Sequence, residues 1–366
     1  MRPPDMRPMR IAYVINSVEG GGAALPVPAI AEALRACGAE IKLFALTGRD
    51  RRALPAMAAA GLEPMVREGG ERDHLSALAW LGRAVRQYRP DVLWTSLTRA
   101  TLLGQLVGAQ QRIPVVSWQH AAFLKPANRR LLRATRRLSG LWLGDSAAVS
   151  AFTAAQLGVP DGKLSTWPLF AADPAAPRAA AWQRGQAVRI GSLGRLHPVK
   201  GYDVLIAALA RLGESTATFE VTIGGEGSDR ARLQAAIDHA RLGNVRLAGF
   251  VSDPRQWLAA QHLYVQPSRS EGFCIAAHEA MQAGLPVIAS NVGEMANSIL
   301  PGVTGALVPP GDPGALAAAL TRVLARPAGL QALGAASRER LFEQFSRDRF
   351  QEAACAIYRR VGELSR

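Results

Sequence analysis

The chain has 366 residues, of which 49% are hydrophobic, and this is enough for two domains that each bury their own core. Its 35 glycines and 23 prolines follow no period, so the composition excludes a fibrous or disordered protein. The net charge is +14, and most of the excess lies in residues 1–180, which hold 23 Lys and Arg against 13 Asp and Glu.

Short β-branched runs alternate with longer helical stretches in both halves of the chain. The first half offers the strands Ile11–Ile15, Ile41–Leu46, Asp91–Thr95, Val115–Trp118 and Leu141–Gly144. The second half offers Val188–Leu193, Phe219–Ile223, Val245–Ala248, Leu263–Gln266, Val287–Ala289 and Ala306–Val308. These runs are apolar throughout, as in parallel strands that helices cover on both faces. The alternation predicts an α/β protein with two Rossmann-like, doubly wound parallel-sheet domains.

A proline-containing segment without strand pattern, AADPAAPRAAAWQRGQ at 171–186, marks the join between the two halves. We therefore divide the chain into a first domain at 1–172, a linker at 173–186, a second domain at 187–345 and a final helical segment at 346–366. We expect that last segment to return to the first domain.

The cysteine count bears on the compartment. Cys37, Cys274 and Cys355 lie far apart in the sequence and match no metal-ligand spacing. They cannot all pair, which favours a reducing compartment. No apolar run approaches the roughly 20 residues that a membrane-spanning helix needs, and the first apolar run is too short for a signal peptide. We therefore expect a cytoplasmic protein.

The basic excess peaks between Lys125 and Arg137. Six basic residues occur there without an acid between them: Lys125, Arg129, Arg130, Arg133, Arg136 and Arg137. Their spacing places most of them on one face of a helix. Such a helix suits an anionic membrane surface, where each basic residue contributes about 1 kcal/mol. The protein would then be peripheral on the inner face of the membrane. A solvated charged face is the alternative, and no motif supports a nucleic-acid partner.

Basic side chains also follow the first strand of the second domain. Gly194 and Arg195 close this strand, and Lys200 follows five residues later, before a helix. Ligands of open α/β sheets bind at the carboxyl ends of strands, where glycine lets the backbone approach them closely. Arg195 can bind phosphate oxygens with two hydrogen bonds and Lys200 adds a point charge, so the pair suits a diphosphate. A turn with two exposed bases is the alternative.

A second loop carries two carboxylates. Residues 267–275 read PSRSEGFCI, and the helix that follows contains Glu279. Glu271 lies on the loop and Glu279 about one turn into the helix, so both can face one ligand. The first can accept hydrogen bonds from sugar hydroxyls and the second from a ribose, while the helix N-terminus favours phosphate. Two solvated glutamates on an ordinary loop are the alternative.

Together these two segments resemble the signature of the retaining family 4 glycosyltransferases, which have the GT-B fold of two Rossmann-like domains facing across a cleft. The family pattern G-R-L-x-x-x-K-G stands here as GRLHPVKG at 194–201. A longer pattern, which begins P-S-x-x-E-G-F-G, stands at 267–289 without gaps. The resemblance covers the second domain well and the first only in outline.

The resemblance implies a role for each matching residue. The implied catalytic residues are Arg195, Lys200, Glu271 and His120. The implied donor-binding residues are Gly20, Gly21, Gly22, Gly194, Phe250, Val251, Gly272, Phe273, Cys274, Ile275 and Glu279. Of these, Arg195 and Lys200 would bind the donor diphosphate, and Glu279 the ribose. Glu271 would face the donor sugar, and His120 follows a strand where the family places a histidine near that sugar.

Some positions depart from the family pattern or bear on its details. Cys274 replaces the glycine that usually follows Phe273, so the sugar pocket carries an extra side chain. The glycine-rich loop of the first domain lacks the acid that usually ends it. His278 stands where an apolar residue is usual, and we expect it to be structural. Asp145 and Ser146 resemble a family landmark that lines the cleft or caps the next helix.

The resemblance implies a retaining transferase that moves a sugar from a UDP- or GDP-sugar to a glycan or lipid-linked acceptor, in the synthesis of cell-envelope polysaccharide or glycolipid. No Asp-x-Asp pair occurs, so we expect no metal and no cofactor. The alternatives are a non-catalytic scaffold that binds nucleotide sugars or glycans, and a GT-B epimerase or phosphorylase. A nicotinamide dehydrogenase is disfavoured because the glycines at 224–227 have the wrong spacing for a dinucleotide fingerprint.

Overall fold

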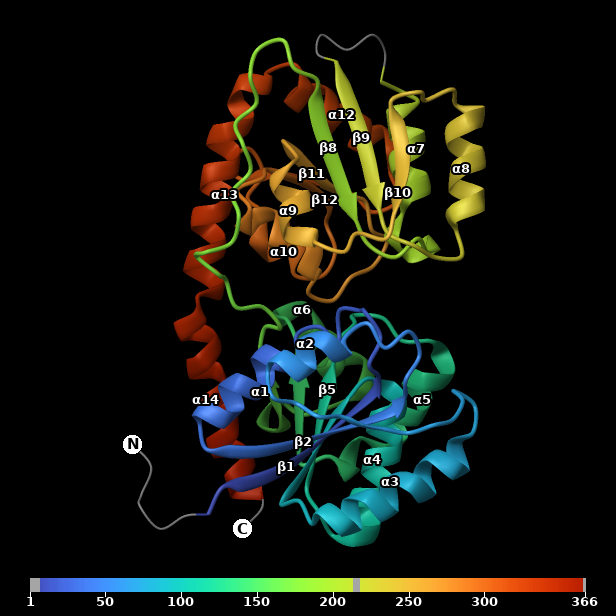
Figure 1. Ribbon diagram of the computed structural model, residues 1–366, viewed down its shortest axis with the longest axis vertical. Coiled ribbons are helices and arrows are strands. Elements are labelled where there is room, and N and C mark those ends of the chain that lie inside the picture. Colours follow the sequence, from blue (N-terminus) through green and yellow to red (C-terminus); the bar gives the residue numbers. More distant parts are fainter. Residues whose placement is uncertain (1–6, 213–217, 365–366) are drawn as a thin grey trace. The chain divides into compact units, whose positions relative to one another are not determined.

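The computed structural model describes residues 7–212 and 218–364 and divides into two compact units (Figure 1). The first unit runs to Ala171 and resumes at Arg347, and the second runs from Ala172 to Ser346. Each unit contains one parallel sheet with helices packed on it, which confirms the predicted pair of doubly wound sheets. Within the described part of the chain, no helix is both long enough and apolar enough to cross a membrane.

The first sheet has seven parallel strands in the order β3-β2-β1-β4-β5-β6-β7. Its strands are β1 (Met9–Ser17), β2 (Ala39–Thr47), β3 (Met65–Val66), β4 (Val92–Ser96), β5 (Val115–Gln119), β6 (Leu141–Gly144) and β7 (Leu164–Thr166). Its helices are α1 (Val27–Ala36), α2 (Leu54–Ala59), α3 (His74–Tyr88), α4 (Thr98–Gln111), α5 (Pro126–Thr135), α6 (Ala147–Phe152) and α14 (Arg347–Leu364). A 3-10 turn, η1 (Arg136–Leu138), extends α5.

Both faces of this sheet are buried. Ile11, Tyr13 and Ile15 of β1 pack in a core with α1, α2 and α14, whereas Ala12 and Val14 pack in a second core with α3 and α4. This arrangement explains why the strand sequence is apolar throughout rather than alternating.

The second sheet has six parallel strands in the order β10-β9-β8-β11-β12-β13. Its strands are β8 (Val188–Leu193), β9 (Phe219–Gly224), β10 (Val245–Gly249), β11 (Leu263–Gln266), β12 (Val287–Ser290) and β13 (Gly305–Val308). Its helices are α7 (Tyr202–Leu209), α8 (Arg230–His239), α9 (Pro254–Ala259), α10 (Ile275–Gln282), α11 (Met295–Ser298), α12 (Pro313–Leu324) and α13 (Leu330–Phe345). The strand order reverses between β8 and β11, and ligands of doubly wound sheets bind beside such a reversal.

The segment that joins the two units forms no helix or strand and lies along the second unit. The amide of Ala172 donates to the carbonyl of Phe345 over 2.7 Å, and that of Asp173 donates to the side chain of Gln282 over 2.7 Å. The amide of Ala179 donates to the carbonyl of Ala283 over 2.7 Å. These bonds fix the joining segment to the C-terminal ends of α10 and α13.

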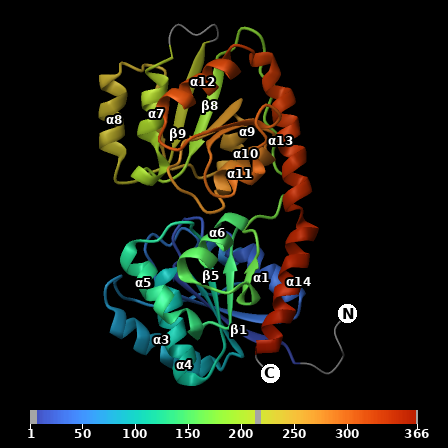
Figure 2. The same cartoon turned by 180° about the vertical axis from the view of Figure 1, so that it is seen from behind.

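Helix α14 is the last element of the chain, yet it packs beside α1 in the first unit (Figures 1 and 2). Its buried face consists of Phe350, Ala354, Ile357 and Val361. A disulfide joins Cys37, directly after α1, to Cys355 in α14, across 318 residues of sequence. The hydroxyl of Tyr358 also donates to the carbonyl of Gly38 over 2.9 Å.

The disulfide corrects the inference drawn from the cysteine count. Only Cys274 is a free cysteine, and it is buried. The cysteines therefore do not support a reducing compartment. Their distance in the sequence was a poor guide because α14 returns to the first unit and brings Cys355 to Cys37.

Candidate functional site

The two loops with charged side chains lie against each other beside β8 and β11. Gly201 has a φ of +67°, and a β-carbon there would come within 2.0 Å of the carbonyl oxygen of Pro267. The amide of Arg269 donates to the carbonyl of Val199 over 2.8 Å. Only glycine allows this approach of the two backbones, so the fold brings both predicted motifs into one site.

Arg269 ties the same junction to α7. Its guanidinium donates two hydrogen bonds of 2.7 Å to the carboxylate of Asp203 and one of 2.8 Å to the carbonyl of Pro198. This guanidinium holds the pKa of Asp203 below its usual range. Neither residue stands among the predicted site residues. A bidentate pair of this kind fixes geometry, so Arg269 positions the loop that carries Lys200.

Glu271 and Lys200 form the centre of the site. The Nζ atom of Lys200 donates to Oε1 of Glu271 over 2.7 Å, and this oxygen also accepts from Ser268 over 2.6 Å and from Gln266 over 3.4 Å. The side chains of Glu271 and Lys200 are 9% and 22% exposed. Burial alone would lower the pKa of Lys200, but the Glu271 carboxylate raises it above its usual value. Lys200 therefore stays charged in a site from which most water is excluded.

Arg195 lies beside this pair but is not committed to it. Its side chain is exposed, and it makes no hydrogen bond or ion pair with any residue that the structure describes. A β-carbon at the preceding Gly194 would contact the side chain of Lys200, so the backbone at 194 runs directly past the lysine. The guanidinium of Arg195 is thus free to receive an anion next to Lys200.

The loop after Glu271 turns sharply into α10. Cys274 adopts a left-handed conformation with a φ of +65° and occupies the N-cap position of α10. The amide of Glu294 donates to the carbonyl of Gly272 over 2.9 Å, and a β-carbon at Gly293 would come within 2.3 Å of that oxygen. Burial and the neighbouring Glu271 carboxylate raise the pKa of the Cys274 thiol well above its usual value, so the thiol stays protonated.

His278 supports this turn from inside the second unit. Its Nδ1 atom lies 2.9 Å from the carbonyl oxygen of Cys274, and its Nε2 atom lies 2.8 Å from the hydroxyl of Ser298. The ring stacks on Phe273 at 4.0 Å and meets the edge of Phe345 at 5.1 Å. Burial lowers the pKa of His278 to about 4, so the ring is neutral near pH 7. His278 therefore holds in place the backbone of the turn that runs from Gly272 through Ile275.

Glu279 is placed differently from Glu271. Its carboxylate makes no hydrogen bond or ion pair within the described ranges, although burial raises its pKa to about 7, against the opposing effect of Arg255. A partly buried carboxyl group without a partner and with a strongly shifted pKa is typical of a ligand-binding position. Glu279 is the fifth residue of α10, about one turn into the helix, as predicted from the sequence.

The segment after β9 packs on the loop of Arg195. A β-carbon at Gly225 would come within 1.9 Å of the carbonyl oxygen of Gly194, and Gly194 donates its amide to Gly224 over 3.0 Å. These glycines therefore allow the segment after β9 and the loop of Arg195 to pack backbone against backbone. Phe250, directly after β10, is 53% exposed, and the following Val251 packs over Gly224.

The remaining predicted residues belong to the first unit and form a separate cluster. His120 follows β5, and its Nε2 atom lies 2.7 Å from the hydroxyl of Ser96 at the end of β4. Its Nδ1 atom lies 3.7 Å from a carboxylate oxygen of Asp145, which follows β6. The ends of the neighbouring strands β4, β5 and β6 thus supply the His120 imidazole and the two side chains beside it.

The glycine-rich loop after β1 is at the surface of the first unit. The amide of Gly20 donates to the carboxylate of Asp50 over 3.0 Å, and that of Gly21 donates to the carbonyl of Glu19 over 2.8 Å. Gly20 and Gly22 are exposed. The loop therefore offers exposed backbone close to the strand ends.

Several residues of the site escaped the sequence analysis. Ser268 and Gln266 donate to Glu271, and Ser96 contacts His120. Each is a small or neutral polar residue at the end of an apolar strand and is completely buried. Its position in or directly after an apolar run was the signal in the sequence that could have singled it out.

Comparisons with known proteins identify the family to which both units are similar. A model described as glycosyl transferases group 1 matches residues 187–326, and one described as glycosyltransferase family 4 matches residues 20–170. A lipopolysaccharide core biosynthesis mannosyltransferase of Rhizobium leguminosarum is 30% identical over 287 residues, which are 76% of this chain and 77% of that protein.

Other similar proteins are matched over part of their length or in fold alone. A glycogen synthase of Mycobacterium tuberculosis is 36% identical over 188 residues, which are 50% of this chain and 45% of that protein. The chain thus spans about half the length of this relative. The crystal structure of HepE of Anabaena in complex with UDP-glucose has a TM-score of 0.81 at 21% identity and covers 95% of this chain and 99% of that one. At this identity the likeness shows a shared GT-B fold.

Proposed function

The chain belongs to the family 4 glycosyltransferases of group 1, and from this membership and the site in its second unit we propose that it is a retaining glycosyltransferase that uses a nucleoside-diphosphate sugar. The observation that carries the proposal is the ion pair of Lys200 and Glu271 beside the uncommitted Arg195, with the unpartnered Glu279 on the helix that follows the loop of Glu271. Two cations and two carboxylates at one sheet edge match the diphosphate, ribose and sugar of such a donor.

Each group has a part in the proposed reaction. Arg195 and Lys200 bind the diphosphate, Glu279 accepts hydrogen bonds from the ribose, and Glu271 faces the sugar. The bond between C1 of the sugar and the phosphate oxygen breaks, and the acceptor hydroxyl forms the new bond to C1 on the same face. The acceptor proton passes to the leaving diphosphate. The two cations stabilise the negative charge that grows on this leaving group, so they act most strongly in the transition state.

We assign the acceptor to the first unit. His120 is held between Ser96 and Asp145, which fixes the direction of its ring. A glycan or lipid-linked acceptor of cell-envelope polysaccharide or glycolipid synthesis is supported by the similarity to the mannosyltransferase of lipopolysaccharide core synthesis. We further propose that Arg195 and Lys200 take the role a metal would have, so that no metal or other cofactor is needed.

The proposal is tested with a panel of nucleotide sugars. UDP-glucose is the first donor to try, since HepE has been crystallised with it. Released UDP or GDP is measured with and without lipid-linked acceptors, and binding is measured separately by calorimetry. Binding with turnover supports the transferase. Absence of binding to every nucleotide sugar overturns it, and binding without turnover replaces it with a nucleotide-sugar-binding scaffold.

A second test separates the roles within the site. Arg195→Ala and Lys200→Ala should each lower turnover far more than Glu279→Ala, because only the two cations meet charge that develops in the transition state. Glu279→Ala should mainly weaken donor binding. Equal losses of turnover in all three variants would mean that the diphosphate position is wrongly assigned.

A further inference from the structure

Three helices of the first unit form a face without acidic residues. Helices α3, α4 and α5 contact one another in this order, and they lie together on one side of the unit in both views (Figures 1 and 2). None of the three contains an Asp or Glu. Between His74 and Gly144 the sequence has eleven basic residues and one acid, Asp91, which is bound to Arg7 and to the amide of Arg10.

The basic side chains of this face are exposed and not neutralised. The exposed ones are Arg83, Arg86, Arg89, Arg112, Lys125, Arg129, Arg130, Arg133 and Arg137. None of them forms an ion pair within the part of the chain that the structure describes. Arg129 donates to the amide oxygen of Gln156, which is neutral. The face therefore carries a local positive charge that an anionic partner outside the unit would complement.

Large apolar side chains are exposed among these bases. They are Leu75, Leu106, Phe123, Leu131 and Leu138, with exposures of 84%, 47%, 59%, 51% and 40%. Helix α5 shows the combination most clearly, because Leu132 is its only buried residue. Exposure of leucine and phenylalanine to water is unfavourable, and their transfer to the acyl region of a bilayer lowers the free energy.

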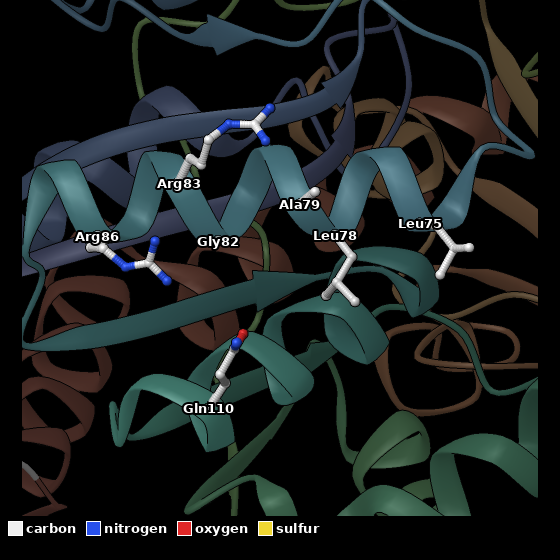
Figure 3. A pocket seen from close by; sticks show the side chains of 7 residues that line it. All are labelled: Leu75, Leu78, Ala79, Gly82, Arg83, Arg86 and Gln110. Carbon is white, nitrogen blue, oxygen red and sulfur yellow. The ribbon is translucent and has the colours of Figure 1, made fainter.

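A groove between α3 and α4 belongs to the same face (Figure 3). Its volume is about 280 Å³, and it is lined by Leu75, Leu78, Ala79, Gly82, Arg83, Arg86 and Gln110. Figure 3 shows the side chains of Leu75, Leu78 and Arg86 on the side of α3 that faces Gln110 of α4. Apolar walls next to two arginines suit a group that joins an anionic head to a hydrocarbon chain.

The rest of the first unit lacks this combination. Helix α1 carries Glu32, and α14 carries Asp348, Glu352 and Glu363. The absence of acids is thus a property of one face and not of the whole unit.

We propose that the face of α3, α4 and α5 docks the protein on an anionic lipid bilayer, with the arginines at the headgroups and the exposed Leu and Phe side chains inserted between them. Nucleic acid or another soluble polyanion would match the arginines but gives no partner to Leu75, Leu131 or Phe123. This inference does not depend on the proposed transferase activity, because it concerns a surface outside the donor site.

The test is co-sedimentation of the full chain with vesicles. Vesicles of phosphatidylcholine alone are compared with vesicles of equal parts phosphatidylcholine and phosphatidylglycerol. We expect binding to the anionic vesicles only, weakened by added salt as the charges are screened. Equal binding to both kinds of vesicle, or to neither, overturns the proposal.

A double variant and a matched control locate the basic part of the surface. Arg130→Glu with Arg133→Glu should weaken binding to the anionic vesicles at least about tenfold, because two charges change sign at the bilayer. Arg322→Glu with Arg326→Glu makes the same change of net charge on exposed positions of the second unit and should leave binding unchanged. Equal losses in both pairs would mean that net charge alone is responsible, and would overturn the assignment to this face.

The apolar part of the surface has its own variant. Phe123→Ser with Leu131→Ser keeps the charge and should still weaken vesicle binding several-fold, while retention on heparin stays the same. Unchanged vesicle binding in this variant, together with tight binding to heparin or duplex DNA, would show a polyanion site in place of a membrane surface. Binding of UDP, measured on the same samples, tells a failure of this proposal from a failure of the donor site.

Discussion

The two units are built on the same doubly wound sheet but use their charges in opposite ways. In the second unit Lys200 and Glu271 are paired over 2.7 Å beside the strand ends, inside a site that excludes most water. In the first unit the charged side chains of α3, α4 and α5 are all basic, and apart from Arg99, which pairs with Asp73, they face solvent without an ion pair in the described part of the chain. A paired, buried charge at a strand end suits a small ligand, whereas unpaired charges on helices suit an extended surface.

The difference also concerns how strictly backbone geometry fixes each feature. Gly201 and Gly225 permit approaches at which a β-carbon would lie within 2.0 Å of a carbonyl oxygen. Such contacts leave few sequences that can form the second unit's site. The helical face of the first unit has no such constraint, because arginines on an exposed helix can exchange positions without altering the fold. A site of the first kind can be recognised in the sequence by a motif. A surface of the second kind can be recognised only by its composition.

The strongest test of this contrast removes the cation from the buried pair. Lys200→Met should lower kcat by about 100- to 1,000-fold, the usual loss for one group that stabilises transition-state charge. It should also lower the thermal midpoint, because Glu271 keeps its burial without its cation. Turnover is followed by release of the nucleoside diphosphate, and unfolding by circular dichroism.

A double variant separates the structural role of Lys200 from its catalytic role. Lys200→Met with Glu271→Gln removes the uncompensated charge and should regain most of the thermal stability. It should not regain turnover. Recovery of turnover together with stability would show that Lys200 serves only to hold the loop in place.

A second test asks whether the two units can be perturbed independently. Replacing both disulfide cysteines, Cys37→Ser with Cys355→Ser, should lower the free energy of unfolding by about 2–4 kcal/mol, since the bridge closes a loop across 318 residues. UDP affinity, measured by calorimetry, should stay unchanged because the donor site belongs to the second unit. The matched control is dithiothreitol, which should destabilise the native protein to the same extent and have no effect on the double variant. A parallel loss of UDP affinity would contradict the independence of the units.

The pH dependence of donor binding tests the assignment of Glu279. Its pKa is raised to about 7 in the folded protein, so the group is protonated between that value and the pKa of about 4 that it has in an unfolded chain. Its burial therefore lowers stability as the pH rises through this window. Ribose hydroxyls donate to the ionised form, so the affinity for UDP-glucose, whose two phosphates each keep one negative charge across this range, should fall by about tenfold per pH unit below pH 7. Titration calorimetry across this range measures the effect.

The matched variant is Glu279→Gln, which keeps the shape but does not titrate. Its affinity for UDP-glucose should be lower than that of the native protein at pH 8 and should not vary between pH 5.5 and pH 8. A persistent pH dependence in this variant would assign the effect to another group.

Features that depend on a short stretch of sequence could be predicted, and features that depend on contacts between distant segments could not. The apolar runs predicted the central strands of both sheets, whereas β3 and β7 were missed because strands of two and three residues leave no pattern. The disulfide was missed because it depends on the return of α14 and not on any spacing. Lys200 and Glu271 could be predicted to lie together from a motif, but their direct ion pair could not. It depends on where Gly201 lets the two loops meet.

The smallest expected effect concerns Cys274, which stands at the glycine position of the family pattern that the sequence resembles. Cys274→Gly removes the strain of a left-handed residue, about 1 kcal/mol, and also removes a buried thiol and makes the unfolded chain freer. These contributions oppose one another, so stability should change by less than about 1 kcal/mol. The choice of donor should change more, by about tenfold between competing nucleotide sugars, because the pocket gains the space of one side chain. Cys274→Ala is the control, since it shortens the side chain but keeps the β-carbon and the strain. If Ala and Gly shift the donor ratio equally, the thiol alone sets the preference. If neither shifts it, the turn into α10 does not contact the sugar.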